Sequence, residues 1–226
     1  MVFDLDDTLF PERAFACSGF EAVAAAFAET LGPENQSLAD MRRLFDSDAR
    51  PRVFNALLAE RDFAESSELV SRMVRAYREH IPRINLYADA NRVLTKLRAG
   101  YNLGLISDGP ALTQKNKISA LSIEERLDQI ILTDEIGDAF HKPSRGPFEL
   151  MAEQLGVPHG SCVYVADNPA KDFIAPNTLG WLSVRILRDE GIYRDVEPPP
   201  NGRPTCTIKT LDDLASVMAR HGPPGD

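Results

Sequence analysis

The stretch Phe3-Asp4-Leu5-Asp6-Asp7-Thr8-Leu9-Phe10 decides both the fold and the chemistry of this chain. It places three carboxylates directly after an apolar start and directly before another apolar patch. Like charges this close repel one another and are costly to desolvate, so burying them requires a metal ion, a cationic side chain or shifted pKa values. A divalent cation is the simplest answer. An isolated Asp-x-Asp is more often an acidic turn after a strand, so the rest of the chain decides.

The first two carboxylates have the chemistry of a nucleophile and of an acid/base group. Asp4 can accept a phosphoryl group and pass it to water, which replaces one difficult step by two easier ones. Asp6, two residues later, can donate and accept the protons.

The composition is that of a water-soluble globular protein. The 226 residues, 43% hydrophobic and 26% charged, suffice for one sizeable domain or for a core with a smaller insert. No apolar run in the sequence approaches the ~20 residues that span a bilayer. The start of the chain has neither a basic leader nor a cleavage site, so we expect a cytoplasmic protein.

Charge and cysteine content exclude other classes of function. The net charge of -9 disfavours nucleic acid and anionic lipid as partners, because phosphate backbones and headgroups attract clustered Lys and Arg. A phosphate ester as substrate therefore requires a site that is locally positive within an acidic protein. Cys17, Cys162 and Cys206 are odd in number and far apart, which argues against a disulfide framework and a zinc site.

Between residues 12 and 84 the apolar residues recur only at helical spacing. Gly32-Pro33 and the polar stretch at residues 47–52 interrupt the pattern, and we interpret the apolar stripes as the core of a small helical bundle. The segments with this spacing are 20–31, 38–45, 53–58 and 69–77.

After Pro82 the pattern changes to alternating helices and strands. This alternation predicts an α/β fold, a Rossmann-like, doubly wound parallel sheet with helices on both faces. The predicted strands are 1–5, 101–106, 129–132, 162–166, 182–187 and 206–208, and the predicted helices are 90–97, 112–121, 148–155 and 211–218.

Polar residues follow several of these strands at the end where such sheets bind ligands. Open parallel sheets bind ligands beyond the carboxyl ends of their strands. We therefore expect one crevice to collect residues that are far apart in the sequence. They are Asp4 and Asp6, Ser107 to Gly109, and Asp167 with Asp172.

With these motifs in place, the chain resembles a hydrolase of the haloacid dehalogenase superfamily. All four motifs of that superfamily occur in the expected order, each after the expected element. They are Asp4-x-Asp6-x-Thr8, Ser107, Lys142-Pro143 and the stretch from Ala166 to Asp172. The resemblance implies a discontinuous catalytic core, residues 1–11 and 85–226, and a helical cap, residues 12–84, that closes over a small soluble substrate.

The resemblance also implies a magnesium site and a phosphate site. Mg²⁺ prefers oxygen ligands, and Asp4, Asp167 and the backbone carbonyl of Asp6 form a suitable set. Ser107 and the backbone N–H groups of Asp108 and Gly109 would clasp the phosphate oxygens, and Lys142 would supply positive charge. Asp172 would pair with Lys142 or support metal-bound waters, and Thr8 would position Asp6 and the turn.

Several other side chains bear on this site. Asp108 stands where the family often has Asn, and its charge would repel a phosphate unless it points away. Lys115 and Lys117 are rival cations, which we interpret as the solvated face of a polar helix. Three arginines are candidates for reading the non-reacting part of the substrate, namely Arg13, Arg50 and Arg52.

The predicted function is Mg²⁺-dependent hydrolysis of a small phosphorylated metabolite through an aspartyl-phosphate. Asp6 argues for phosphoryl transfer, because the release of a halide needs no proton from the enzyme. Three alternatives stay open: a phosphomutase, a 2-haloacid dehalogenase and a non-catalytic binding module on the same scaffold. The expected partner is the small metabolite, and the protein is expected to be a monomer or a homodimer.

Overall fold

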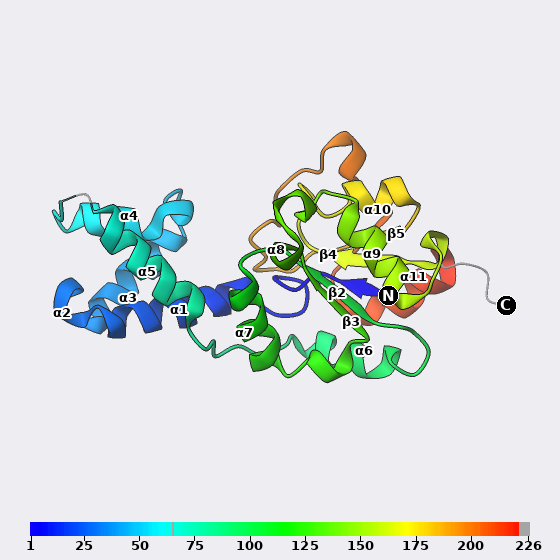
Figure 1. Cartoon of the computed structure of the whole chain (residues 1–226), viewed down its shortest axis with the longest axis horizontal. Helices are drawn as coiled ribbons and strands as arrows, with labels where there is room; N and C mark the ends of the chain where they lie inside the picture. Colours follow the sequence, from blue (N-terminus) through cyan, green and yellow to red (C-terminus); the bar gives the residue numbers. More distant parts are fainter. Residues whose placement is uncertain (65, 222–226) are drawn as a thin grey trace. The chain divides into compact units, whose positions relative to one another are not determined.

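The chain divides into two compact units in the computed structural model, which describes residues 1–64 and 66–221. One unit comprises Met1–Glu12 and Ile84–Asp226, and the other comprises Arg13–Arg83 (Figure 1). The role of the second unit as a cap stays a prediction. None of the described helices is long and apolar enough to cross a membrane.

The first unit contains a parallel sheet of six strands in the order β3-β2-β1-β4-β5-β6. The strand β1 is shorter than expected, because the chain leaves the sheet after Asp4, whose N–H still donates to the Val165 carbonyl at 2.9 Å. The strands are β1 (Val2–Phe3), β2 (Gly104–Ser107), β3 (Gln129–Leu132), β4 (Val163–Ala166), β5 (Leu182–Ile186) and β6 (Cys206–Ile208).

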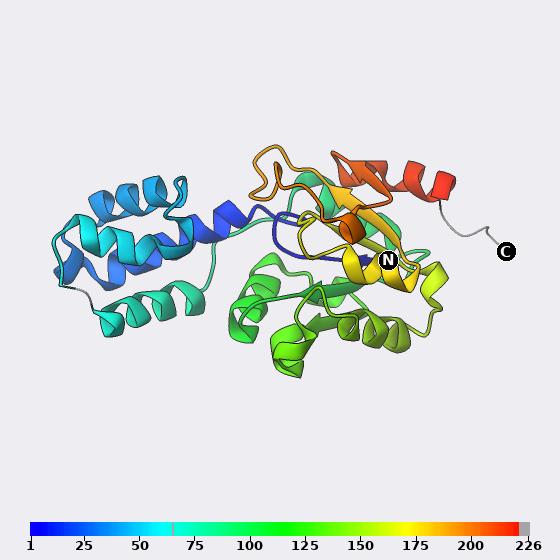
Figure 2. The ribbon, with the colours of Figure 1, turned by 90° about the horizontal axis from the view of Figure 1, so that it is seen from above.

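Helices cover both faces of this sheet, as predicted for a doubly wound fold. Figure 2 shows α9 on one face and α6 and α11 on the other. The helices are α6 (Ala88–Leu97), α7 (Ala111–Leu121), α8 (Thr133–Ile136), α9 (Gly146–Leu155), α10 (Ile174–Leu179) and α11 (Leu214–His221). Single turns of 3-10 helix lie at Glu124–Arg126, Asp138–Phe140, His159–Ser161, Pro200–Gly202 and Leu211–Asp213.

The α9 face of the sheet carries an aromatic core. The ring of Phe148 lies 4.9 Å from the ring of Tyr164 and 5.5 Å from that of Trp181, both edge-on. Gly104 in β2 allows α9 to approach, because a Cβ atom there would lie 2.5 Å from the sulfur of Met151. In the sheet, β4 pairs with β1, so Tyr164 lies beside the strand that precedes Asp4.

The second unit consists of helices that pack around an aromatic cluster. Tyr77 contacts Phe15, Phe20 and Phe54, with ring centroids 5.4 to 5.8 Å apart. The predicted all-helical character of this segment is found among its described residues. The helices are α1 (Glu12–Ala26), α2 (Ala28–Leu31), α3 (Glu34–Phe45), α4 (Val53–Glu60) and α5 (Ser67–Glu79), with a 3-10 turn at Arg50–Arg52.

A buried ion pair ties the first loop to the far strands of the sheet. Arg188, after β5, donates to Asp89 in α6 at 2.7 Å and to the carbonyl of Thr8 at 2.8 Å. Asp89 also accepts from the hydroxyl of Thr210 and the N–H of Leu211. Although burial opposes ionisation, the contact with Arg188 keeps the pKa of Asp89 below its ordinary value.

We expect Arg188→Met to lower the free energy of unfolding by about 3 kcal/mol, because it leaves Asp89 charged and buried without its partner. The thermal midpoint would fall by roughly 6 to 12 °C for a chain of this length. The matched control is Arg92→Met, which removes an exposed partner of Asp212 and should leave the midpoint almost unchanged. Equal losses in the two variants would contradict this role for Arg188.

Candidate active site

Three acidic side chains meet at the carboxyl ends of β1 and β4. Oxygens of Asp4, Asp167 and Asp172 all lie within 4.8 Å of one another, and all three side chains are buried. They line a cavity of about 200 Å³ in the first unit. Its lining also includes Asp6, Glu12, Ser107, Asp108, Gln114, Lys117, Asn168, Lys171 and Tyr193.

Lys142 is the cation at the centre of this cluster. Its ammonium group lies 2.5 Å from Asp4 and 2.8 Å from Asp172, and its side chain is fully buried. It also donates to the hydroxyl of Tyr164 at 3.1 Å. Burial alone would lower the pKa of Lys142, but the facing carboxylates of Asp172 and Asp4 hold it well above its ordinary value. The structure therefore places Lys142 and Asp172 together, as predicted.

The acidic groups repel one another despite this cation. Burial raises the pKa of Asp4 to about 6, and the ammonium of Lys142 opposes the shift only in part. Burial also raises the pKa of Asp167 well above its ordinary value, and the charge of Asp4 adds to the shift. Burial is thus the main cause of both shifts, and repulsion between the carboxylates adds to that of Asp167.

The donor set fits a hard divalent cation. Among the described residues, no protein group donates a hydrogen bond to the carboxylate of Asp167, so its oxygens can bind an ion. Asp172 is engaged differently, because one oxygen lies against Lys142 and the other accepts from the N–H of Asn168 at 3.1 Å. Carboxylate oxygens are the ligands that Mg²⁺ prefers in proteins. The third predicted ligand, the backbone carbonyl of Asp6, stays a prediction.

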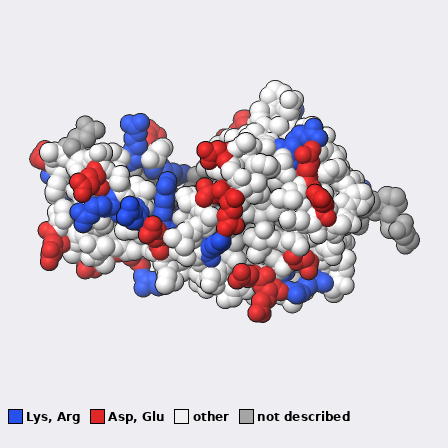
Figure 3. Space-filling view, viewed as in Figure 1, with Lys and Arg blue, Asp and Glu red and all other residues white. Residues whose placement is uncertain are grey.

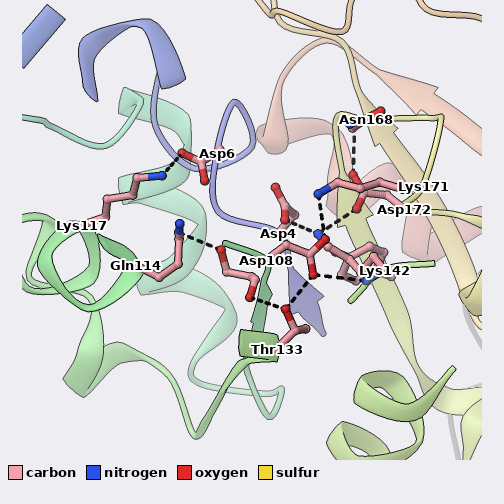
Figure 4. A network of polar contacts seen from close by, with 12 residues as sticks. Asp4, Asp6, Asp108, Gln114, Lys117, Thr133, Lys142, Asn168, Lys171 and Asp172 are labelled. Carbon is pink, nitrogen blue, oxygen red and sulfur yellow. Dashed lines mark hydrogen bonds and ion pairs between the residues drawn. The ribbon is translucent and has the colours of Figure 1, made fainter. Parts of the chain in front are cut away.

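Asp6 belongs to the same cavity but contacts a different lysine. Its carboxylate accepts from Lys117 at 2.7 Å (Figure 4), and the Lys117 side chain is only 6% exposed. The expectation that Lys117 lies on a solvated face is therefore wrong, because α7 turns this residue towards the acidic site. Lys115, two residues earlier, is exposed and pairs with Glu135.

The loop that carries Asp6 is held by its neighbours. Asp7 adopts a left-handed conformation, with a φ of 48°. Its carboxylate accepts from the N–H groups of Glu12 and Ile192, both at 2.8 Å, which joins the loop to the start of α1 and to the segment after β5. Thr8 is fully buried. Its carbonyl accepts from Arg188, so Thr8 takes part in fixing the turn.

The predicted phosphate loop follows β2. The hydroxyl of Ser107 donates to the amide oxygen of Gln114 at 3.0 Å, and both side chains are buried. Gly109 has a φ of 109°, and a Cβ atom there would lie 2.9 Å from the Gln114 amide nitrogen. The positive φ favours glycine at this position, where the loop passes Gln114. Gln114 could not be predicted from the sequence, because it stands on a helix without an apolar stripe.

Both carboxylate oxygens of Asp108 accept hydrogen bonds. One oxygen accepts from the hydroxyl of Thr133 at 2.9 Å and from the N–H of Lys142 at 3.2 Å. The other accepts from Lys171 at 2.8 Å (Figure 4). Although burial opposes ionisation, Lys142 and Lys171 hold the pKa of Asp108 below its ordinary value.

Two further residues of the cavity, Glu12 and Tyr193, were not predicted from the sequence. Burial and the charge of Asp6 raise the pKa of Glu12 to about 8. Burial and the charge of Glu12 raise the pKa of Tyr193 to about 12. Glu12 had been assigned to the helical insert, and Tyr193 lies in a segment without periodicity, so neither offered a signal.

The three candidate arginines lie in the second unit. Arg13 forms an ion pair with Asp46. Arg50 lies 4.7 Å above the ring of Phe45 and donates to its carbonyl at 2.9 Å, whereas Arg52 is exposed. Figure 3 shows basic and acidic side chains interspersed on the face in view. A role for these arginines with substrate stays a prediction.

Several curated relatives of this chain are phosphatases. Glyceraldehyde 3-phosphate phosphatase of Methanopyrus kandleri is 31% identical over 206 residues, which cover 88% of this chain and 87% of the relative. Pyrimidine 5'-nucleotidase YjjG of Escherichia coli is 24% identical over 229 residues, which cover 97% of this chain and 97% of the relative. The prediction of a phosphatase-type enzyme agrees with these relatives.

Solved structures share the fold over almost the whole chain. The hydrolase YfnB of Bacillus subtilis, described as bound to magnesium, matches with a TM-score of 0.66, 20% identity and 96% coverage of both chains. Residues 1–186 match the model of the haloacid dehalogenase-like hydrolases. The predicted fold class is confirmed, and the chain belongs to the haloacid dehalogenase-like hydrolase family.

Proposed function

We propose that this protein is a Mg²⁺-dependent phosphatase that hydrolyses a small phosphomonoester through an aspartyl-phosphate on Asp4. The observation that carries the proposal is the meeting of Asp4, Asp167 and Asp172 around the buried Lys142. The names of the curated relatives support phosphate esters as the substrate class.

Asp4 and Asp167 would hold the metal, together with the Asp6 carbonyl. When bound, Mg²⁺ supplies charge neutralisation and orients a phosphate oxygen. Lys142 keeps the Asp4 carboxylate in place, 2.5 Å from its ammonium group. Asp172 holds Lys142 from the other side, so that Lys142 does not swing away when charge moves from Asp4 to the phosphoryl group.

The chemistry then runs in two steps. An oxygen of Asp4 attacks phosphorus, and the leaving alcohol takes a proton from Asp6 as the ester bond breaks. Asp6 next removes a proton from water, which attacks the phosphoryl group and returns the Asp4 carboxylate and inorganic phosphate. Because Asp6 contacts Lys117 in the structure, it has to exchange this contact for the leaving-group oxygen.

Ser107 would bind a phosphate oxygen with the backbone N–H groups of Asp108 and Gly109. A hydroxyl has a single proton, and in the structure this proton goes to the amide oxygen of Gln114. Ser107 can therefore donate to phosphate once Gln114 turns its amide N–H towards it. Lys142 would contribute the remaining charge.

We expect Asp4→Asn to reduce phosphate release by at least about a thousandfold, because the variant lacks the nucleophile. The assay follows phosphate release from p-nitrophenyl phosphate, glyceraldehyde 3-phosphate and a pyrimidine 5'-nucleotide, with Mg²⁺ and with EDTA. The control variant Asp213→Asn changes an exposed carboxylate and should match wild type. Equal release by wild type and Asp4→Asn would refute the mechanism.

We expect Asp6→Asn to separate the two steps. p-Nitrophenolate leaves without a proton, so the variant should still form the aspartyl-phosphate from this ester but hydrolyse it slowly, because no base activates water. Mass spectrometry of acid-quenched protein should find one phosphoryl group on the peptide that contains Asp4. An Asp6→Asn enzyme with wild-type turnover and no phosphorylated peptide would contradict this role.

We expect the Asp167 carboxylate to bind the metal but to destabilise the metal-free protein. The Asp167→Asn variant removes one of the repelling carboxylates, so its metal-free thermal midpoint at pH 7.5 should rise by about 2 to 4 °C, which corresponds to about 1 kcal/mol. Mg²⁺ should raise the midpoint of wild type but not that of the variant. A wild-type midpoint that is insensitive to Mg²⁺ would count against the site.

The shift of the thermal midpoint by Mg²⁺ should depend on pH, because its proposed ligands Asp4 and Asp167 titrate. The same unfolding measurement, repeated at several pH values, checks this. Asp4 and Asp167 have folded-state pKa values above the ordinary value. Without metal the folded state therefore binds more protons than the unfolded state, and its stability falls as the pH rises through about 6. Mg²⁺ requires deprotonated carboxylates. The shift of the midpoint by Mg²⁺ should thus shrink as the pH falls through about 6.

A further inference from the structure

An ion pair joins two loops across the candidate phosphate site. Asp108 follows β2, Lys171 follows β4, and their charged groups are 2.8 Å apart. Both residues line the same cavity as Asp4 and Ser107. Lys171 lies within the fourth motif, the stretch from Ala166 to Asp172, but the resemblance to the family assigned it no role.

The charge of Asp108 is a problem for a phosphate site. The backbone N–H groups of Asp108 and Gly109 are expected to hold phosphate oxygens, so a carboxylate on the same loop stands next to a bound dianion. Two of the contacts of Asp108, from Thr133 and from the N–H of Lys142, come from neutral donors. These donors orient the carboxylate but do not cancel its charge, whereas Lys171 forms an ion pair with it and adds to the effect of the Lys142 ammonium.

Lys171 has capacity for a second ligand. An ammonium group has three N–H donors, and Lys171 uses one of them on Asp108. Its side chain is 35% exposed, in contrast to the fully buried Lys142. The group therefore keeps accessible surface in the cavity, and Asp108 fixes its position there.

We propose that Asp108 and Lys171 form one charge-compensated unit of the phosphate site, in which Lys171 binds a phosphate oxygen and cancels the charge of Asp108. The proposal rests on the proposed function, because it assumes that the cavity binds the phosphate of the substrate. The rival explanation is a clasp that only holds the two loops together. The two explanations differ in what happens when both charges are removed.

The test measures the affinity for inorganic phosphate by calorimetry in the presence of Mg²⁺, independently of turnover. We expect Lys171→Gln to bind phosphate about tenfold more weakly, since it loses a charged hydrogen bond and leaves the Asp108 carboxylate uncompensated. The double variant Asp108→Asn/Lys171→Gln should recover about half of this loss on a logarithmic scale, to roughly threefold below wild type. Lys171→Arg, which keeps the charge, should stay within about threefold of wild type.

The matched control is Lys115→Gln. Lys115 also forms an ion pair, with Glu135, but it is exposed and does not line the cavity. This variant should bind phosphate as wild type does. Thermal unfolding shows which variants are folded, and if Lys171→Gln is not, the comparison of Lys171→Arg with the double variant takes its place.

Three results would overturn the inference: unchanged phosphate affinity in Lys171→Gln, a double variant as weak as the single one, and a wild type that does not bind phosphate. An equal loss of phosphate affinity in Lys115→Gln would also overturn it, because the loss in Lys171→Gln would then reflect only the net charge of the protein. Failure of the proposed function looks different, since it appears as absence of turnover by wild type while phosphate affinity still responds to Lys171.

Discussion

The contact of Lys142 with Asp4 and Asp172 is the interaction on which the rest of the site depends. An ammonium group is buried only at high cost unless carboxylates face it, and here two of them do, at 2.5 and 2.8 Å. These three residues come from the first loop, from the segment before α9 and from the loop after β4. Their mutual attraction therefore holds three distant parts of the chain at one point.

The balance of charge at this point explains why a cation belongs there. One ammonium offsets one of the three clustered carboxylates, which leaves an excess that a divalent ion would match. Burial raises the pKa values of both Asp4 and Asp167, and the carboxylates of Asp4 and Asp172 add to the shift of Asp167. Around the cluster Asp6 is paired with Lys117 and Asp108 with Lys171, whereas Glu12 also lines the cavity and has a raised pKa. The two lysines bring positive charge into the site, which an acidic protein needs if it is to accept a phosphate ester.

The sequence predicted the positions of those site residues that follow directly from the geometry of a parallel sheet. In such a sheet every strand ends at the same edge, so Asp4, Ser107 and Asp167 could be placed in one crevice without knowing any side-chain position. Lys117 and Gln114 could not, because both lie on α7, whose orientation depends on how it packs and not on an apolar stripe. Lys171 was missed because a lysine in a loop is usually solvated, and its partner Asp108 is distant in the sequence. The short helices α8 and α10 have too few turns to show periodicity.

The most direct test of the account is a crystal structure of the protein with Mg²⁺ and beryllium fluoride, which mimics an aspartyl-phosphate. The account predicts a trifluoroberyllate group on an oxygen of Asp4, with one Mg²⁺ bound by Asp4, Asp167 and the carbonyl of Asp6, and with Lys142 still in contact with Asp4. A beryllium fluoride group on another residue, or a metal ion that does not touch both Asp4 and Asp167, would contradict it.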